Sequence, residues 1–488
     1  MTDFSFRLGD LIPGGFHGAE AERAIAMVSA DSRKIGPGGL FFALSGSKAD
    51  GRAFVADAVA KGAAAIAGEF TRPDDLPDSV AYVMLHDARR TLALTAARIH
   101  PRQPETIVAI TGTSGNSSVA DFTRQIFAHL GRNSASLGTI GVITASGASY
   151  GSLTTPDPLT LHQTLDRLAA DGVSHLAMEA SSHGLDQRRL DGVHLSAGAF
   201  LNLGRDHLDY HPSVEDYLAA KLRLFDLLPQ GAPAVINADG AYAEEALGYS
   251  GLADRPVITV GRKGRTLKLL DVQREGFAQR LTVEAAGEEY PMLLPLAGDF
   301  QAGNALVAAA LVMAVGEDRA ATLALLPRLV TVPGRLERVG EARGGLAIVD
   351  YAHKPDALAA VLATLRPYAA GRLICVFGCG GDRDRGKRPI MGEIAAKGAD
   401  VAIITDDNPR SEAPAAIRGE ILTGAKGPAQ VVEIGDRAEA IQAAVRMLGA
   451  GDVLVVAGKG HETGQIVGDR VLPFSDRDAV AAAIAELA

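Results

Sequence analysis

A glycine-rich turn with serine and threonine hydroxyls occupies residues 111–118, where the sequence reads Thr-Gly-Thr-Ser-Gly-Asn-Ser-Ser. Turns of this kind bind phosphate groups, because their backbone amides and the N-terminus of the following helix point at the negative charge. The hydroxyl of Ser117 or Ser118, shortly after the second glycine, is also suited to Mg²⁺. The candidate nucleotide-binding residues of the turn are Gly112, Thr113, Ser114, Gly115, Asn116, Ser117 and Ser118.

The turn departs from the general phosphate-loop pattern at two positions. That pattern has a glycine five residues before Gly115 and a lysine directly after it, and this chain has Ile110 and Asn116 there. Asparagine can donate a hydrogen bond to a phosphate, but it cannot neutralise its charge. The residues alone leave two interpretations open: a phosphate loop without its cation, and a glycine turn joining a strand to a helix in an ordinary α/β domain.

The segments around the turn follow the order that a phosphate loop requires. Residues 107–110 form an apolar run that predicts a buried strand, and apolar residues between Val119 and Leu130 recur at helical spacing. Further along, apolar runs alternate with helical patterns, which predicts βαβ units and parallel sheets. Nearer the N-terminus, an alanine-rich stretch from Phe54 to Ala67 predicts a helix.

Two proline-containing breaks, at residues 100–104 and 332–335, divide the chain into three predicted α/β domains. We expect an N-terminal domain at 1–102, a central domain with a parallel sheet at 103–334, and a C-terminal, Rossmann-like domain at 335–488. In the last of these, residues 346–350, 373–377, 401–405 and 453–457 predict buried strands.

Composition limits the classes of function. The chain has 488 residues, of which 47% are hydrophobic and 22% charged, which is typical of a globular protein. Its net charge of −10 argues against a partner such as nucleic acid, and no apolar run is long enough for membrane insertion. We therefore expect a cytoplasmic protein. Its two cysteines, Cys375 and Cys379, are expected to be a reduced, packed pair.

Polar runs follow two predicted strands of the central domain, at residues 179–184 and 202–211. In open α/β sheets, ligands bind outside the carboxyl ends of the strands, so both runs are expected to face the same crevice as the glycine turn. Glu179 and His207 could then bind a cation that accompanies nucleotide phosphates. Taken singly, each residue also fits a solvated loop position.

Four more polar runs follow strands of the third domain, at residues 349–356, 378–388, 406–410 and 458–462. Their arginines, together with an asparagine and a glutamate, suit a zwitterionic ligand, because guanidinium groups bind carboxylates and a glutamate binds an ammonium group. A surface network of salt bridges is the alternative interpretation of the same residues.

The order of these motifs resembles that of the Mur ligase family over nearly the whole chain. Further matches are Asp31-Ser32-Arg33, residues 37–41 and Thr154-Thr155-Pro156-Asp157, and residues 407–410 match the family's signature for diaminopimelate rather than lysine. The resemblance implies a role in peptidoglycan precursor biosynthesis. ATP would activate the D-glutamyl carboxylate of UDP-N-acetylmuramoyl-L-alanyl-D-glutamate as an acyl phosphate, which the amine of meso-2,6-diaminopimelate then attacks.

The resemblance also implies roles for residues that the patterns alone do not single out. Lys221, which by itself reads as a solvated helix residue, matches the lysine that the family carbamylates, and two Mg²⁺ ions are implied. The implied metal-site residues are Ser117, Glu179, His207 and Lys221 as its carbamate. The implied catalytic residues are Glu179, His207, Lys221 and Arg335. The ATP site would add Asn304, Arg335, Asp350 and His353 to the glycine turn.

The two remaining substrates have implied sites of their own, which would bind small molecules in a monomeric enzyme. The UDP-muramoyl-dipeptide site comprises Ser32, Ser47, Lys48, Ala49, Thr154, Thr155, Ser181, Gln187 and Arg189. The diaminopimelate site comprises Arg383, Asp407, Asn408, Pro409, Arg410, Gly458 and Glu462.

The missing lysine at position 116 leaves two classes of function open. One is a working ligase in which Arg335 and the metal ions carry the reaction. The other is a homologue or loop variant that binds the substrates without efficient turnover.

Overall fold

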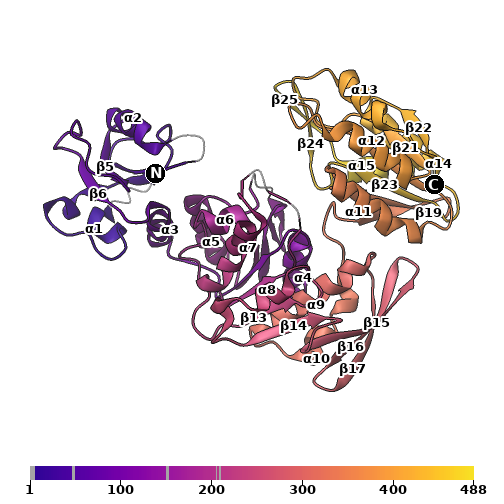
Figure 1. Cartoon of the computed structure of the whole chain (residues 1–488), viewed down its shortest axis with the longest axis horizontal. Coiled ribbons are helices and arrows are strands. Elements are labelled where there is room, and N and C mark those ends of the chain that lie inside the picture. Colours follow the sequence, from indigo (N-terminus) through magenta and orange to yellow (C-terminus); the bar gives the residue numbers. More distant parts are fainter. Residues whose placement is uncertain (1–5, 47–49, 150–152, 205, 208–209, 488) are drawn as a thin grey trace. The chain divides into compact units, whose positions relative to one another are not determined.

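The computed structural model describes residues 6–46, 50–149, 153–204, 206–207 and 210–487. The chain divides into two compact units, one made of Met1–Leu267 with Val307–Thr322 and the other of Lys268–Leu306 with Leu323–Ala488. Figure 1 shows the helices and strands, coloured along the sequence. Both units are mixed α/β structures. None of the helices in the described ranges is long and apolar enough to cross a membrane.

The first unit begins with a four-stranded parallel sheet in the order β3-β4-β5-β6. The helix predicted from Phe54 to Ala67 is wrong in its second half: α2 ends at Ala60, and Ala63–Gly68 is strand β5. Gly62, with a φ of 90°, ends the helix, and the small side chains of β5 are buried between two neighbouring strands. The elements are β1 (Phe6–Arg7), α1 (Leu8–Leu11), β2 (Ala24–Ile25), β3 (Met27–Ser29), β4 (Gly39–Ala43), α2 (Val55–Ala60), β5, β6 (Ala81–Met84) and α3 (Ala88–Ile99).

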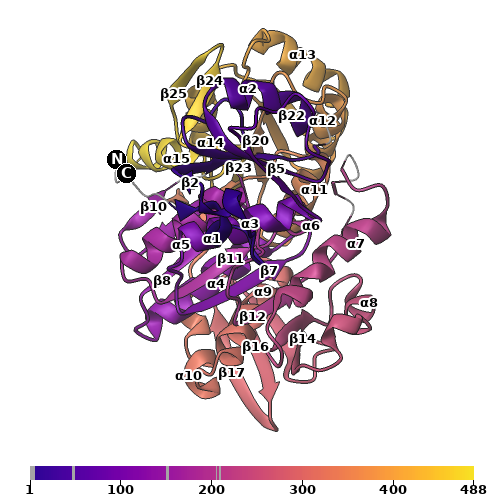
Figure 2. The same cartoon turned by 90° about the vertical axis from the view of Figure 1, so that its left-hand side faces the viewer.

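A larger, eleven-stranded mixed sheet follows, and strand β7 (Thr106–Thr111) lies inside it between its parallel neighbours β11 and β12 (Figure 2). Residues 107–111 are buried, as expected for a parallel strand covered on both faces. The other elements are α4 (Asn116–His129), β8 (Ser134–Gly138), β9 (Gly141–Thr144), β10 (Gly147–Ser149), α5 (Pro158–Ala170), β11 (His175–Glu179), α6 (Ser182–Asp186), β12 (Ala197–Phe200), α7 (Val214–Leu222), β13 (Ala234–Asn237), α8 (Ala243–Leu247) and β14 (Val257–Gly261).

Three antiparallel strands interrupt the expected alternation of strands and helices: β15 (Leu267–Glu275), β16 (Ala278–Ala285) and β17 (Glu288–Leu294). Their tight turns use positive-φ residues, among them Gly276, Ala286 and Gly287. Buried and exposed residues alternate along β17, which is the pattern of a sheet with one solvated face. Helices α9 (Asp299–Ala314) and α10 (Arg319–Leu323) follow.

The second unit contains a six-stranded sheet in the order β18-β19-β23-β20-β21-β22, parallel except for β18. Buried apolar clusters lie on both of its faces, and the two free cysteines are buried here. The elements are β18 (Glu337–Ala342), β19 (Gly345–Asp350), α11 (Pro355–Leu365), β20 (Leu373–Phe377), α12 (Lys387–Gly398), β21 (Val401–Ile404), α13 (Pro414–Gly424), β22 (Gln430–Glu433), α14 (Arg437–Met447), β23 (Val453–Ala457), the hairpin β24 (Gly464–Val467) and β25 (Arg470–Pro473), and α15 (Asp476–Ala485).

Candidate active site

The glycine turn lies where the sequence predicts it, between the end of β7 and the start of α4. Gly115 caps α4 with a φ of 91°, a conformation that favours glycine. Asn202, which follows β12, holds the turn: its backbone oxygen accepts from the Thr113 amide (3.0 Å) and its side-chain Oδ1 accepts from the Ser114 amide (3.1 Å). The loop is therefore fixed to a neighbouring strand end by a residue for which the sequence predicts no role of its own.

Asn116 does not extend away from the loop as a lysine at this position would. Its Nδ2 donates to the backbone oxygen of Gly112 (2.8 Å), so the side chain folds back onto the loop. Its Oδ1 is buried and has no hydrogen-bond partner among the described residues. A buried amide oxygen without a partner costs free energy, so position 116 has an acceptor to offer and no positive charge.

Lys221, near the end of α7, reaches the same carbonyl. Its Nζ donates to the Gly112 oxygen at 2.7 Å, and the side chain is 2% exposed. Burial lowers the pKa of the Lys221 amine to about 7, although the carboxylates of Asp206 and Glu179 act in the opposite direction. The helix residue is therefore a buried lysine that contacts the phosphate loop, and its amine titrates near neutral pH.

Glu179, at the end of β11, organises the space beside the loop. Its Oε1 accepts from the Ser117 hydroxyl (2.9 Å) and the Thr139 amide (2.8 Å), and its Oε2 accepts from the Thr139 hydroxyl (3.1 Å). A Cβ on Gly138 would lie 2.0 Å from Oε1, so only glycine leaves room for this carboxylate. These contacts join residues that are 40 and 62 positions apart in the sequence. Thr139 is not among the residues predicted from the sequence.

The residues near Glu179 fit a hard divalent cation such as Mg²⁺. A carboxylate and the Ser117 hydroxyl are oxygen donors of the kind that Mg²⁺ prefers, with nucleotide phosphates supplying other positions. Within the described ranges, no group of three or more His, Cys, Asp or Glu side chains is arranged to bind a metal ion.

His207, the other predicted metal-site residue of this region, has a φ of 54°. Its ring centre lies 4.8 Å from that of His183, and its Nε2 lies 3.7 Å from Asp206 Oδ2.

Five residues expected at the dipeptide end connect to Glu179 through a chain of hydrogen bonds. The Thr155 hydroxyl donates to the Glu179 backbone oxygen (2.9 Å) and accepts from the Ser181 amide (3.0 Å). Arg189 donates to the Thr155 backbone oxygen and to Gln187 Oε1, both at 2.7 Å, and burial lowers its pKa. The hydroxyl of Thr154 lies 3.0 Å from that of Thr139. The structure thus gathers this set on one side of the carboxylate.

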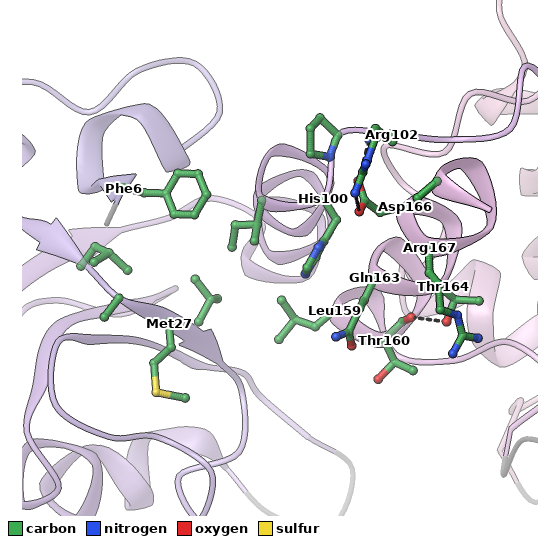
Figure 3. A pocket seen from close by; sticks show the side chains of 16 residues that line it. Phe6, Met27, His100, Arg102, Leu159, Thr160, Gln163, Thr164, Asp166 and Arg167 are labelled. Atoms are coloured by element: carbon green, nitrogen blue, oxygen red, sulfur yellow. Dashed lines mark hydrogen bonds and ion pairs between the residues drawn. The ribbon is translucent and has the colours of Figure 1, made fainter. Parts of the chain in front are cut away.

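The residues expected at the uridine end are not gathered in the same way. Ser32 is buried and its backbone oxygen accepts from Lys61 Nζ (2.9 Å), while Ser47, Lys48 and Ala49 lie outside the described residues. A cavity of about 1100 Å³ in the first unit is lined by residues such as Phe6, Met27, Leu159 and Gln163 (Figure 3). None of its lining residues is an expected site residue, so its size alone does not identify the active site.

In the second unit, the loops after β21 and β23 meet. Asn408 Nδ2 donates to Glu462 Oε2 (3.0 Å), and a Cβ on Gly458, whose φ is 123°, would lie 2.9 Å from Asp407 Oδ2. Lys459 lies between these loops with its side chain fully buried. The two runs of the expected amino-acid site are therefore in direct contact through Asn408 and Glu462. Lys459, which is not among the predicted site residues, lies within reach of both.

The glycine run after β20 completes this group. Arg410, at a φ of 51°, donates from Nη1 to the Gly381 backbone oxygen (2.9 Å), and a Cβ on Gly381 would lie 1.9 Å from the Pro409 oxygen. Arg383 is exposed beside them and donates to the Asp382 backbone oxygen (3.2 Å). Two guanidinium groups thus accompany Asn408 and Glu462.

The residues expected on the nucleotide side of the second unit surround the end of β19. Asp350 accepts from the amides of Leu336 and Ala352, both at 2.8 Å. Burial raises its pKa, while the nearby Arg335 guanidinium acts in the opposite direction. Arg335 stacks on Tyr351 (4.7 Å), and its buried Nε has no hydrogen-bond partner among the described residues.

Two further nucleotide-side residues have partners of their own. The His353 Nδ1 is 2.9 Å from the Tyr351 backbone oxygen, and burial lowers the pKa of its ring. Asn304 donates to Gln301 Oε1 (3.0 Å), a partner one helical turn away on α9.

The site combines a phosphate loop beside a buried carboxylate and lysine with a second α/β region, whose strand ends carry arginine, asparagine and glutamate. Three domain models of one ligase family match the chain. The Mur ligase family, catalytic domain, matches residues 24–105. The Mur ligase middle domain matches residues 110–312, and the Mur ligase, glutamate ligase domain, matches residues 334–460. The chain belongs to the Mur ligase family.

Within this family, the most similar proteins found share one name. The chain is 57% identical, over 98% of its own length and 99% of the relative, to UDP-N-acetylmuramoyl-L-alanyl-D-glutamate–2,6-diaminopimelate ligase of Bradyrhizobium diazoefficiens. It is 53% identical to the ligase of the same name from Caulobacter vibrioides, over 96% and 97% of the two chains. A solved structure of a ligase with this name shares 32% identity and a TM-score of 0.73, with 99% of both chains covered. MurF from Thermotoga maritima, solved with ADP, shares the fold (TM-score 0.56, 19% identity, 94% and 96% covered).

Proposed function

We propose that this chain is an ATP-dependent ligase that joins meso-2,6-diaminopimelate to UDP-N-acetylmuramoyl-L-alanyl-D-glutamate, a step in peptidoglycan precursor biosynthesis. The observation that carries the proposal is the relationship at 53–57% identity, over nearly whole chains, to ligases with this name. The contact between Asn408 and Glu462, which joins two runs of the expected amino-acid site, supports it.

The reaction proceeds in two steps. A carboxylate oxygen of the D-glutamyl side chain attacks the γ-phosphorus of ATP, the bond to ADP breaks, and an acyl phosphate forms. The neutral amine of diaminopimelate then attacks the acyl carbon, phosphate leaves with the bonding electron pair, and the amine loses a proton. The loop amides of residues 112–118 and the N-terminus of α4 bind the phosphates of ATP.

Glu179, Ser117 and His207 are the residues we assign to Mg²⁺, with two ions as the expected number. When bound, the metal neutralises charge on the phosphate oxygens during transfer. Lys221 joins this set as a carbamate: its neutral amine adds to CO₂ and releases a proton, which converts a cationic side chain into an anionic one. The buried position and a pKa of about 7 support this assignment, because the neutral amine is the form that reacts.

The dipeptide and the amino acid occupy separate sets of residues in this proposal. Thr154, Thr155, Ser181, Gln187 and Arg189 bind the dipeptide end beside Glu179, and Ser32 with residues 47–49 binds the uridine end. In the amino-acid pocket, the guanidinium groups of Arg383 and Arg410 bind carboxylates and Glu462 binds an ammonium group, with Asp407, Asn408, Pro409 and Gly458 shaping the pocket.

The remaining assignments extend the same proposal. Arg335, Asp350, His353 and Asn304 serve the nucleotide, and the working domains are residues 1–102, 103–334 and 335–488. A monomer in the cytoplasm is the expected form, since each proposed substrate is a small, water-soluble molecule.

The test is the identity of the product. The purified chain is incubated with ATP, Mg²⁺ and the UDP-muramoyl dipeptide, with meso-diaminopimelate in one reaction and L-lysine in another, and the products are identified by mass spectrometry. We expect an amide product that contains diaminopimelate, at a rate at least 100-fold above that with lysine. An equal or higher rate with lysine would contradict the choice of amino acid.

A further inference from the structure

Lys459 is a fully buried lysine between the two loops of the amino-acid pocket. A buried ammonium group is costly unless it is paired and hydrogen-bonded. Its Nζ donates to Asn408 Oδ1 and to the Gly464 backbone oxygen, both at 2.9 Å. It also lies 3.4 Å from Asp407 Oδ1 and 3.5 Å from Glu462 Oε2. The lysine therefore contacts three of the residues assigned to this pocket.

These contacts determine the orientation of the Asn408 amide. Its Oδ1 accepts from Lys459 Nζ and from the Ile466 backbone amide, each at 2.9 Å. An amide oxygen has two lone pairs, so both are used by the protein. One Nδ2 hydrogen goes to Glu462 Oε2, which leaves the second as the group that Asn408 can offer to a ligand. Asn408 is thereby set as a donor, suited to a carboxylate.

Lys459 also places two carboxylates close together. Asp407 and Glu462 both lie within 3.5 Å of its ammonium group, on different loops. Lys459 offsets the repulsion between the two carboxylates at close range, while the buried Arg437 guanidinium also interacts with both of them. Removing the Lys459 charge would therefore weaken the hold on Glu462 beside Asn408. Lys459 thus joins the loop after β21 to the loop after β23. The buried Arg437 guanidinium bridges the same region, since it donates to the backbone oxygens of Asp406 and Ala457.

We propose that Lys459 is a positioning residue for the amino acid: it fixes Asn408 as a donor to a ligand carboxylate and holds Glu462 where it binds a ligand ammonium group. The inference rests on the proposed function for the choice of diaminopimelate as that ligand. Lys459 acts through Asn408 and Glu462 and does not itself contact the reacting atoms.

The experiment is a double-mutant cycle measured by isothermal titration calorimetry. The full chain is saturated with the UDP-muramoyl dipeptide, Mg²⁺ and a non-hydrolysable ATP analogue, and meso-diaminopimelate is titrated in, so that the measurement does not depend on turnover. The variants are Lys459→Met, Asn408→Ala and the double variant. Lys397→Met, at an exposed lysine paired with Glu393 on α12, is the matched control.

We expect Lys459→Met to weaken diaminopimelate binding by about 30-fold or more, with affinity for the nucleotide analogue and the dipeptide changed by less than twofold. Because Lys459 acts partly through Asn408 and partly through Glu462, the double variant should lose more than Asn408→Ala alone but clearly less than the sum of the two single losses. Lys397→Met should bind as the natural chain does. If Lys459→Met does not fold, Lys459→Gln, which keeps a donor for Asn408 Oδ1, replaces it in the same cycle.

Two results would overturn the inference while leaving the proposed function in place: unchanged diaminopimelate affinity in Lys459→Met, or losses that add in the double variant. If the natural chain binds L-lysine instead of diaminopimelate, the proposed function fails, and the same cycle with lysine decides the role of Lys459. If it binds neither amino acid, both proposals are overturned.

Discussion

The two polar sites of this chain both lie at the carboxyl ends of parallel strands, but their buried lysines have different surroundings. In the amino-acid pocket, Lys459 is held by Asn408 and the Gly464 carbonyl and lies beside two carboxylates. In the phosphate loop, Lys221 donates to Gly112, and Asn116 leaves a buried oxygen without a partner among the described residues. The buried lysine of the pocket thus has several polar partners before any ligand binds, whereas the loop keeps one buried acceptor without a partner among the described residues.

The largest effect is expected at the carboxylate beside the loop. Glu179→Gln keeps the shape of the side chain but removes the charge assigned to Mg²⁺, so turnover should fall by roughly 100- to 1,000-fold. The fall in turnover is measured as steady-state phosphate release with all substrates present. Glu393→Gln, on the exposed face of α12, is the control and should keep full activity. A loss below tenfold for Glu179→Gln would contradict the metal assignment.

A gain of activity is expected from restoring the loop cation. Asn116→Lys would place a positive charge against the transferring phosphate, and such a group contributes about 3–4 kcal/mol, or roughly 100- to 1,000-fold in rate. Turnover should therefore rise, most steeply together with Ser117→Thr, while diaminopimelate affinity stays within twofold.

The single variant Ser117→Thr serves as the control for this gain, since it keeps the hydroxyl that contacts Glu179. Its rate should stay close to that of the natural chain. If Asn116→Lys also leaves the rate unchanged, the loop does not need a lysine at position 116. The difference between the two sites would then have no effect on turnover.

A smaller effect is expected in the amino-acid pocket from Arg410→Lys. The variant keeps a charge but loses the planar fork that binds a carboxylate at two points, and charged hydrogen bonds of this kind are worth about 1.5–3 kcal/mol. The KM for diaminopimelate should rise by roughly 10- to 100-fold, with the KM for ATP unchanged. Arg446→Lys, at an exposed position on α14, should leave both constants unchanged. Equal increases in both KM values for Arg410→Lys would indicate a general structural defect.

The smallest effect concerns pH and Lys221. With a pKa of about 7, roughly three quarters of its amine is neutral at pH 7.5, compared with about 0.1% for a lysine at 10.5. The neutral fraction, and with it carbamylation at fixed dissolved CO₂, should rise between pH 6 and pH 8. Carbon-13 NMR with labelled bicarbonate should show the carbamate signal in the natural chain and not in Lys221→Met. A signal that appears only above pH 9 would contradict the lowered pKa.

The sequence predicts the buried parallel strands well, because such strands are continuous apolar runs. Residues 373–377 and 453–457 coincide with β20 and β23. The alanine-rich stretch at Phe54–Ala67 misled the prediction, since alanine fits a helix and a tightly packed strand, and only pairing with β4 and β6 selects the strand at Ala63–Gly68. The antiparallel strands β15–β17 were missed because their alternation of polar and apolar residues is weak.

The polar runs at strand ends were predicted as site residues from the sequence, because ligands bind at the carboxyl ends of strands in open parallel sheets. Their partners were not, because those contacts depend on tertiary placement. Thr139 reaches Glu179 across 40 positions, and Lys459 reaches Asn408 across 51. Lys459 belongs to the polar run at residues 458–462, which was predicted from the sequence. Its complete burial, which only the structure shows, distinguishes it from a solvated lysine.

The most direct test is phosphate release by the unsubstituted chain, with Asn116 in place and with each substrate omitted in turn. We predict release that requires ATP, the UDP-muramoyl dipeptide and meso-diaminopimelate together, with one phosphate released for each amide bond formed. Release that continues at the same rate without diaminopimelate, or no release above background with all three present, would contradict the assignment of this chain as a ligase.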